Sequence, residues 1–229
     1  MRKVPTLTLA LIKGLRRLDS STVANAVETF EVRLPNTGFA DSRIHCMFPD
    51  FPPMVGFAAT ARIRTADPPM EGHTYIERKD WLTHILAIPE PRVVVLEDMD
   101  EAHSSGRCCE YPPHTLSCVG VVTNGGVRGL PTSRALGMQL FTGNLTVSHA
   151  YAHILDFGCP VTVGRMDVQP GDILHGDLHG VQTVPFEIAD KIPDAAKQIN
   201  QYKQHIAKLC SSGTFTLDRF RGAARDGKR

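Results

Sequence analysis

The sequence has neither a long hydrophobic run nor an excess of charge of one sign. Its 229 residues carry 25 Lys and Arg against 24 Asp and Glu, a formal net charge of +1. Such a balance creates no broad positive field for nucleic acid or an anionic membrane. No apolar stretch approaches the roughly 18 residues that a membrane-spanning helix needs. We therefore expect a small molecule or another protein as partner, with no nucleic acid and no membrane.

The cysteines lack the spacing of a metal site. There are six: Cys46, Cys108, Cys109, Cys118, Cys159 and Cys210. None forms a C-x-x-C pair, and adjacent cysteines such as Cys108 and Cys109 do not readily bridge to each other. This pattern predicts reduced thiols and a cytoplasmic protein. At the N-terminus, Lys13 interrupts the apolar stretch too early for an export signal, so we expect an amphipathic helix there.

The apolar patterning predicts a single compact α/β domain over residues 1–210 and a basic, frayed tail over 211–229. Helical spacing indicates helices over 7–18, 21–30, 72–88, 131–140 and 193–210, with Asp19 or Ser20 as the N-cap of the second. Residues 35–54 are rich in turn formers and predict a loop. Strands are expected over 55–65, 92–98 and 119–122, and as short segments between Gly and Pro-Gly turns over 159–185.

The stretch Val119 to Pro131, "VGVVTNGGVRGLP", carries the first chemical signal. An apolar strand ends at Asn124-Gly125-Gly126, and Arg128 follows. In α/β sheets ligands bind beyond the carboxyl ends of strands. Two glycines permit positive φ and amides that face an anion, and an arginine fork suits a carboxylate or phosphate. On these residues alone, an ordinary turn with a solvated or structurally paired arginine is the favoured interpretation.

A second motif adds specificity. The loop "GVVTNGGVRG" and the segment "VQPGDILHGDLHGVQTVP" together resemble the RraA family, which includes ribonuclease regulators and 4-hydroxy-4-methyl-2-oxoglutarate aldolases. The family segment P-G-D-x-x-x-A-D-x-x-G-V-x-x-V-P is matched at Pro170, Gly171, Asp172, Asp177, Gly180, Val181, Val184 and Pro185. The resemblance covers roughly residues 18–190. It implies an α/β fold of the β/β/α swivelling-domain type, here with N-terminal helices, and a homotrimer or hexamer with the site between subunits.

The resemblance also implies site residues. Arg128 would clamp the substrate and act in catalysis, and Gly106 keeps the family's spacing before it. The substrate-binding residues would be Gly106, Arg107, Cys108, Cys109 and Arg128, with the first four lending backbone amides to a carboxylate. Asn124, Gly125, His149 and Tyr151 are expected to line the pocket, since a family subgroup carries a similar S-H-A-Y stretch.

The sequence departs from the family where the metal is held. The expected acids are replaced by Arg107, Asn124 and Gly129. Mg²⁺ and Mn²⁺ prefer hard oxygen ligands, commonly carboxylates, so no metal is expected at the usual position unless replacement ligands exist, for example within residues 97–103. Two functions stay open: a carbon–carbon lyase of the aldolase or oxaloacetate decarboxylase type, and a non-catalytic regulator of a protein partner. A phosphate-ester clamp formed by Arg107 and Arg128 is a third.

Two histidine clusters have alternative interpretations. In "VSHAYAHILD", His149 and His153 would share a face of a helix, whereas a strand would align His149, Tyr151 and His153. Pocket lining, ordinary packing and a metal site all fit that pattern. His175, Asp177 and His179 alternate as metal ligands do on a strand, but the family match implies a turn with Asp177 in a structural hydrogen bond.

Overall fold

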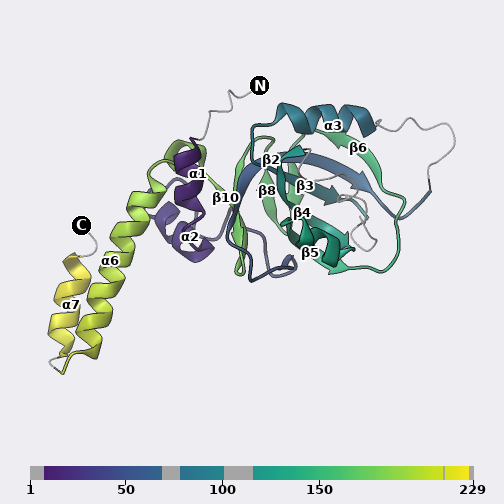
Figure 1. The fold of residues 1–229 in the computed structure, drawn as a ribbon. Coiled ribbons are helices and arrows are strands. Elements are labelled where there is room, and N and C mark those ends of the chain that lie inside the picture. The colour runs from purple at the N-terminus through teal and green to yellow at the C-terminus, as the bar shows by residue number, and fades with distance from the viewer. Residues whose placement is uncertain (1–7, 69–77, 101–115, 214, 227–229) are drawn as a thin grey trace.

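The computed structural model describes residues 8–68, 78–100, 116–213 and 215–226, which form one α/β body with a helical extension (Figure 1). The helices are α1 (Leu9–Leu15), α2 (Ser20–Glu28), α3 (Arg78–Ala87), α5 (Leu130–Ala135), α6 (Ile192–Ser211) and α7 (Leu217–Asp226). The strands are β1 (His45–Cys46), β2 (Met54–Arg64), β3 (Arg92–Asp98), β4 (Cys118–Val127), β5 (Gln139–Leu145), β6 (His153–Phe157), β7 (Val161–Val163), β8 (Met166–Val168), β9 (Ile173–Asp177) and β10 (Gly180–Val184). None of the helices in these ranges is long and apolar enough to cross a bilayer.

The main sheet has a parallel centre. Its order is β1-β5-β4-β3-β2-β9-β10, with β6 paired to the far end of β2. Strands β2, β3, β4 and β5 run parallel, while β1, β6, β9 and β10 pair antiparallel. The carboxyl ends of the four parallel strands therefore meet at one edge of the sheet, where ligands bind in this class of fold.

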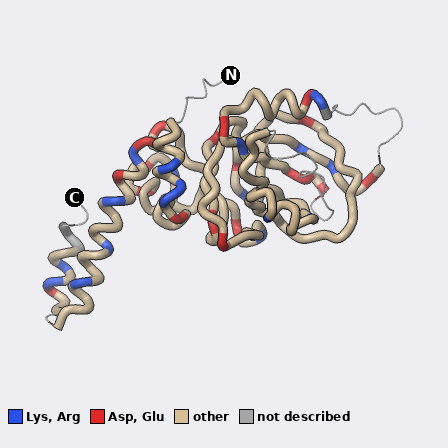
Figure 2. Tube along the Cα trace, viewed as in Figure 1, with Lys and Arg blue, Asp and Glu red and all other residues tan. Residues whose placement is uncertain are grey.

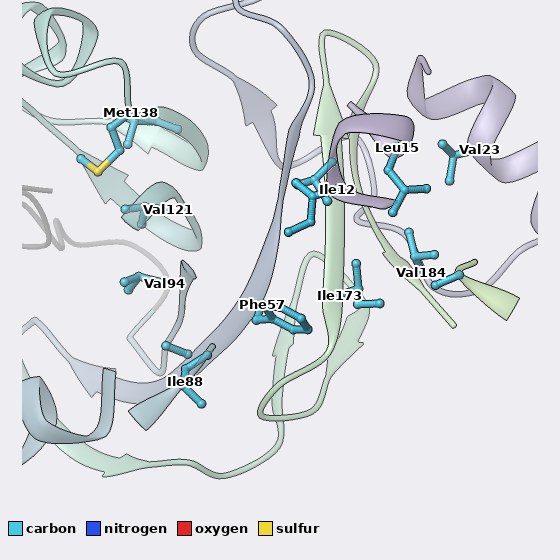
Figure 3. Close-up of a cluster of buried hydrophobic side chains, with 14 of the residues drawn as sticks. Ile12, Leu15, Val23, Phe57, Ile88, Val94, Val121, Met138, Ile173 and Val184 are labelled. Carbon is cyan, nitrogen blue, oxygen red and sulfur yellow. The ribbon is translucent and has the colours of Figure 1, made fainter. Parts of the chain in front are cut away.

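Both faces of the sheet are buried. Alternate residues of β3 point to opposite sides, so Val94 and Leu96 join the cluster under the helices, while Val93 and Val95 join the cluster under the β7–β8 hairpin. Figure 3 shows the first cluster, in which Phe57 of β2 is fully buried. Burying one such side chain stabilises the fold by about 1.5–3 kcal/mol. Burial on both sides explains why these strands read as continuous apolar runs.

The N-terminal helices pack on the antiparallel end of the sheet. Asp19 is the N-cap of α2, because its carboxylate accepts a hydrogen bond of 2.7 Å from the Thr22 amide. Leu15 of α1 and Val23 of α2 lie in the same core as Val184 of β10. The prediction of two helices with a cap at Asp19 or Ser20 is confirmed.

Helix α6 leaves the body after its first turns. Only Ile192 and Ala196 of this helix are buried, and the rest projects away from the sheet with α7 folded back along it (Figure 1). Within the tail, the rings of Phe215 and Phe220 lie 6.3 Å apart. The sequence predicts a frayed tail here, and the structure corrects this: residues 217–226 form a helix that contacts α6.

Basic and acidic residues are interspersed over the described chain (Figure 2). Several of the exposed pairs are ion pairs, such as Arg134 with Asp50 at 2.7 Å and Arg43 with Asp41 at 2.8 Å. Exposed pairs contribute little stability, about 0–1 kcal/mol. In both pairs a carboxylate holds an arginine side chain on the surface.

Candidate functional site at the carboxyl edge of the parallel strands

Strand β4 is longer than its apolar run predicts. The sequence indicates a strand that ends before Asn124, but pairing with β5 continues to Val127, with a register shift between Thr123 and Gly126. Gly126 is needed for close approach, since a Cβ there would lie 2.2 Å from the side chains of Asn144 and Thr146. The positive φ expected for Gly125 and Gly126 is absent, and it occurs at Gly129 instead (φ +71°).

Arg128 is therefore the first residue after a buried strand. It is partly buried, and its Nη1 lies 3.1 Å from Nδ1 of His149. His149 is exposed and lies in the segment between β5 and β6, so strands β4 and β5 bring the two residues together. Within the described part of the chain, no carboxylate forms an ion pair with Arg128. The guanidinium charge at this edge is thus not neutralised by those residues.

The other expected pocket residues have different surroundings. Gly125 is buried, and its N–H donates to Thr123 Oγ1 at 3.0 Å, so that amide already has an acceptor. Tyr151 is 53% exposed and is anchored by its N–H to the Thr65 carbonyl at 3.1 Å. Gly106, Arg107, Cys108 and Cys109 lie outside the described residues.

Asn124 joins two strands through its side-chain amide. Its Oδ1 accepts from the Asp98 amide at 2.7 Å, and its Nδ2 donates to the Asp98 carbonyl at 2.8 Å. Both bonds together fix the orientation of the amide group. The residue that replaces a family acid is therefore a strand connector here, and an ionised carboxylate could not satisfy both Asp98 groups.

The acids at this edge are already engaged. Glu97 pairs with Arg62 at 3.0 Å, and Asp98 accepts from the Thr65 hydroxyl at 2.8 Å. Asp100 accepts from the amides of Ala66 and Thr65, and these hydrogen bonds hold its pKa below the ordinary value.

We tested whether these residues fit the divalent metal that the family implies. Gly129 offers no side chain, and Asn124 uses both ends of its amide on Asp98. Among the described residues, no group of three or more His, Cys, Asp or Glu is arranged to hold a metal ion. This part of the chain does not fit the family's metal.

The two histidine clusters separate in space. His149 contacts Arg128, whereas His153 begins β6 and lies with its Nε2 3.1 Å from the Asp67 carbonyl. Residues 147–152 form neither a helix nor a strand, so neither of the two alignments drawn from the sequence occurs.

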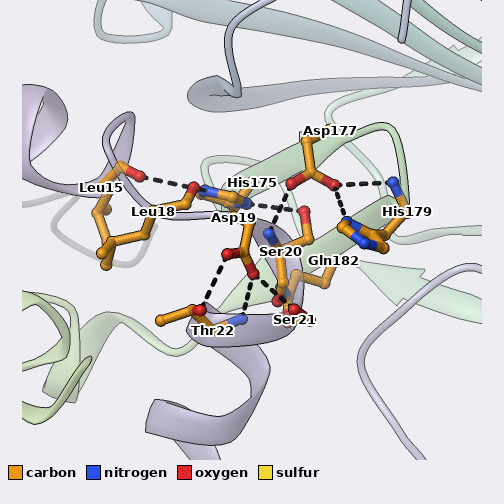
Figure 4. Close-up of polar contacts among 10 residues, drawn as sticks. All are labelled: Leu15, Leu18, Asp19, Ser20, Ser21, Thr22, His175, Asp177, His179 and Gln182. Atoms are coloured by element: carbon orange, nitrogen blue, oxygen red, sulfur yellow. Dashed lines mark hydrogen bonds and ion pairs between the residues drawn. The ribbon is translucent and has the colours of Figure 1, made fainter. Parts of the chain in front are cut away.

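The second cluster, at the β9–β10 turn, fastens the N-terminal helices (Figure 4). The Nε2–H of fully buried His175 donates to the carbonyls of Leu15 and Leu18 at 3.2 and 3.0 Å, and its Nδ1 accepts from the Ser20 hydroxyl at 3.1 Å. Burial lowers the pKa of His175, so the ring is neutral. Because its two nitrogens are satisfied within the fold, His175 is not a metal ligand.

Asp177 completes this network. It accepts from the amides of Ser20 and His179, each at 2.8 Å. Burial opposes its ionisation, but these hydrogen bonds outweigh burial and leave its pKa below the ordinary value. The prediction of a structural hydrogen bond for Asp177 is confirmed.

A polar cleft that the sequence did not indicate lies beside this edge. It has a volume of about 630 Å³, and its lining includes Asn124, Glu97, His45, Arg43 and Arg165. Arg165 has a left-handed backbone (φ +64°) at the β7–β8 turn. The only feature of the sequence that points to this cleft is the Gly-Arg turn at 164–165. That turn does not predict that residues of β1, β3, β5 and β7 line one cleft.

Three of the described cysteines, Cys46, Cys118 and Cys159, are poor candidates for a reactive thiol. Burial raises the pKa of Cys118 to about 11, and burial also raises the pKa of Cys46 and Cys159. A thiol with a raised pKa is a poor nucleophile at neutral pH. These residues therefore do not compete with Arg128 as the centre of a site.

The chain resembles solved structures over most of its length. An uncharacterized protein from Pseudomonas syringae pv. tomato matches with a TM-score of 0.69 and 18% identity, covering 95% of this chain and 99% of that one. Streptomyces coelicolor RraAS2, described as an unusual member of the RNase ES inhibitor RraA protein family, matches with a TM-score of 0.68 and 20% identity, covering 88% and 97%. At these identities the likeness shows the fold.

Sequence comparison assigns the family. A Halalkalibacterium halodurans protein named "Putative 4-hydroxy-4-methyl-2-oxoglutarate aldolase" is 28% identical over 85 residues, 37% of this chain and 40% of that protein. The match thus spans about two fifths of the relative's length. The profile of the RraA-like family, described as Aldolase/RraA, matches residues 21–182, which is well over half of the chain and includes Arg128, His149 and Asp177. The protein belongs to the Aldolase/RraA family.

Proposed function

We propose that this protein binds a small oxo acid or dicarboxylate through Arg128 at the carboxyl edge of the parallel strands. The observation that carries the proposal is the position of Arg128, one residue beyond β4, where His149 and no described carboxylate contacts it. An arginine forms paired, charge-assisted hydrogen bonds with a carboxylate. The name of the Halalkalibacterium relative supports the same class of ligand. The backbone amides of residues 106–109 would bind the ligand's other oxygens.

The reaction we propose is cleavage or decarboxylation of a 4-carboxy-2-oxo acid. In the decarboxylation of oxaloacetate, the bond between C3 and the carboxylate carbon C4 breaks, carbon dioxide leaves, and the electron pair moves to the 2-oxo oxygen as an enolate. A proton then adds to the carbon. The Arg128 guanidinium and backbone amides of this chain would stabilise the negative charge of the enolate. Because the described residues do not fit the family's metal, we propose no cofactor at that position.

The site is proposed to be completed by a neighbouring subunit in a homotrimer or hexamer. Support comes from the segment that carries His149, whose large apolar residues are exposed: Leu145 is 56%, Val147 is 96% and Tyr151 is 53% exposed. Grouped apolar exposure beside a polar site is typical of a surface that another chain covers.

Calorimetry with oxalate, which mimics a pyruvate enolate, and with pyruvate tests the ligand. Arg128→Ala should weaken binding by about 1.5–3 kcal/mol, the scale of hydrogen bonds to a charged group. Arg134→Ala is the matched control, since Arg134 is exposed and paired with Asp50, and its loss should leave the affinity unchanged. Equal affinities of wild type and Arg128→Ala would exclude Arg128 from the site.

A non-catalytic role as a regulator of a protein partner is the second candidate. It is favoured by the family acids that are missing at Asn124 and Gly129. A turnover assay on oxaloacetate and 4-hydroxy-4-methyl-2-oxoglutarate separates the two. Oxalate binding without turnover would support the regulator, and turnover that Arg128→Ala abolishes would support the lyase.

A further inference from the structure

The contact between Arg128 and His149 fixes the state of the imidazole. A guanidinium nitrogen only donates, so Nδ1 of His149, 3.1 Å from Arg128 Nη1, has to accept. The ring is then neutral and carries its proton on Nε2. A protonated ring would instead direct an N–H at the guanidinium and place two positive charges in contact. The Nε2–H, on the far edge of the ring, is directed away from Arg128.

The backbone around His149 is held at both ends. The Thr146 amide donates to the Val127 carbonyl at 3.0 Å, and the Tyr151 amide donates to the Thr65 carbonyl at 3.1 Å. Between them, the Thr146 hydroxyl donates to the Ser148 carbonyl at 3.0 Å. These bonds tie the segment to the ends of β4 and β2. An exposed histidine is thereby held beside Arg128.

The chemical type of the partner distinguishes Arg128 from two exposed arginines, Arg134 and Arg43. Arg134 and Arg43 are each held by a carboxylate, Asp50 and Asp41 respectively. A carboxylate orients a guanidinium but also cancels its charge. A neutral imidazole orients Arg128 and leaves the full positive charge available for an anion.

We propose that His149 is a positioning residue of the anion site: it holds the Arg128 guanidinium through Nδ1 without neutralising it and presents Nε2–H to a second polar group of the ligand. This inference rests on the proposed function, because it takes Arg128 as the ligand clamp. The donor on Nε2 lies one ring width beyond the guanidinium. His149 therefore favours ligands with acceptors at both ends over small monocarboxylates.

Three substitutions of His149 distinguish its effect on the orientation of Arg128 from an effect on the charge of Arg128. His149→Gln keeps an acceptor and a donor, His149→Phe keeps a ring but has neither, and His149→Glu holds Arg128 by an ion pair that cancels its charge. Oxalate affinity from calorimetry should fall less than about threefold for Gln and about tenfold for Phe, as expected for loss of a hydrogen bond to a charged group. The oxalate affinity of His149→Glu should fall further still, because the ion pair cancels the charge of Arg128, although glutamate forms the strongest pair with arginine. Urea midpoints should stay unchanged, since His149 is exposed.

The Glu variant is the decisive arm, because a merely structural role for His149 would be preserved by an ion pair. Oxalate affinity of His149→Phe equal to wild type, or of His149→Glu equal to His149→Gln, would overturn the inference. If Arg128→Ala also bound oxalate as tightly as wild type, the proposed function itself would fail. A loss in Arg128→Ala with none in His149→Phe would refute the role of His149 alone.

Long-range ¹H–¹⁵N spectra give a readout that needs no ligand. The free protein near pH 7.5 should show His149 as the neutral Nε2–H tautomer, and Arg128→Met should relax this preference toward a tautomer mixture. A charged ring or the Nδ1–H tautomer in the wild type would refute the contact on which the inference depends.

Discussion

Replacing Asn124 by Asp, the residue typical of the family, should destabilise this protein. The substitution is nearly isosteric and keeps the oxygen that accepts from the Asp98 amide. It removes the N–H that donates to the Asp98 carbonyl at 2.8 Å. Two oxygens would then face each other at that distance, one of them charged, beside the carboxylates of Glu97 and Asp98.

The magnitude follows from the lost donor. Leaving a partly buried carbonyl without its partner costs about 1–3 kcal/mol, and the retained oxygen bonds the Asp98 amide a little more strongly as a carboxylate. We expect a net loss near 2 kcal/mol at neutral pH. For a chain of this length, that corresponds to a fall in Tm of roughly 4–8 °C.

The pH dependence identifies the cause. The neighbouring carbonyl and acids raise the pKa of the new carboxyl above its unfolded value, so the penalty is present at neutral pH and disappears as the acid protonates. A protonated carboxyl again has an O–H to donate to the Asp98 carbonyl. Urea unfolding should therefore show a deficit relative to wild type that shrinks between about pH 7 and pH 5 for Asn124→Asp.

Asn124→Ala is the control, because it lacks both bonds and carries no charge. Its deficit should stay constant over the same range of pH. An Asp variant as stable as wild type at pH 7 would refute the connector role of Asn124. So would a stabilisation of that variant by Mg²⁺, which would identify position 124 as a metal ligand.

Three further outcomes are expected. Burial lowers the pKa of His84, whose Nε2 has no hydrogen-bond partner among the described residues. The folded protein therefore loses stability as pH falls below 6.5, the pKa of the unfolded side chain. In His84→Phe, the free energy of unfolding in urea should depend less on pH between about pH 7 and 5.5. Val147→Lys should shift the proposed trimer or hexamer toward monomer in light scattering, and a wild type that is monomeric at micromolar concentration would remove the intersubunit argument. Wild type should show little Mg²⁺- or Mn²⁺-dependent oxaloacetate decarboxylation, and Arg107→Glu with Gly129→Asp together should raise it, whereas chelator-sensitive wild-type turnover would indicate replacement ligands.

Local patterns predicted most of the fold. The apolar runs at 55–65 and 92–98 became β2 and β3, because residues buried on both faces are apolar at every position. The cap at Asp19 and the helix from about residue 193 were also predicted from short-range signals. Arg128 was singled out from its loop motif, but the predicted strand ended at residue 122, whereas β4 runs to the residue before Arg128. Its role as a ligand clamp stays a prediction.

The features of the structure that the sequence did not predict depend on long-range contacts. Strand β4 extends to Val127 because β5 pairs with it there, which a run of Asn and Gly does not announce. The contact of Arg128 with His149 joins residues from different loops, and the motif around His149 suggested a helix or a strand equally well. Helix α7 forms against α6 in a segment whose composition alone predicts fraying.

The residues that replace the family acids at positions 124 and 129 each have a structural role of their own. At position 124 an ionised acid would lack the donor, since one side chain both donates to and accepts from Asp98. At position 129 the chain turns left-handed, with φ +71°, to begin α5, and a side chain there would have open space but a strained backbone. An acid at either position would therefore cost stability, unless a bound cation offset that cost. Arg128, in contrast, depends on the end of β4 and on His149 and needs neither acid. This edge of the sheet is consequently suited to holding an anion through arginine, whether or not the anion is then cleaved.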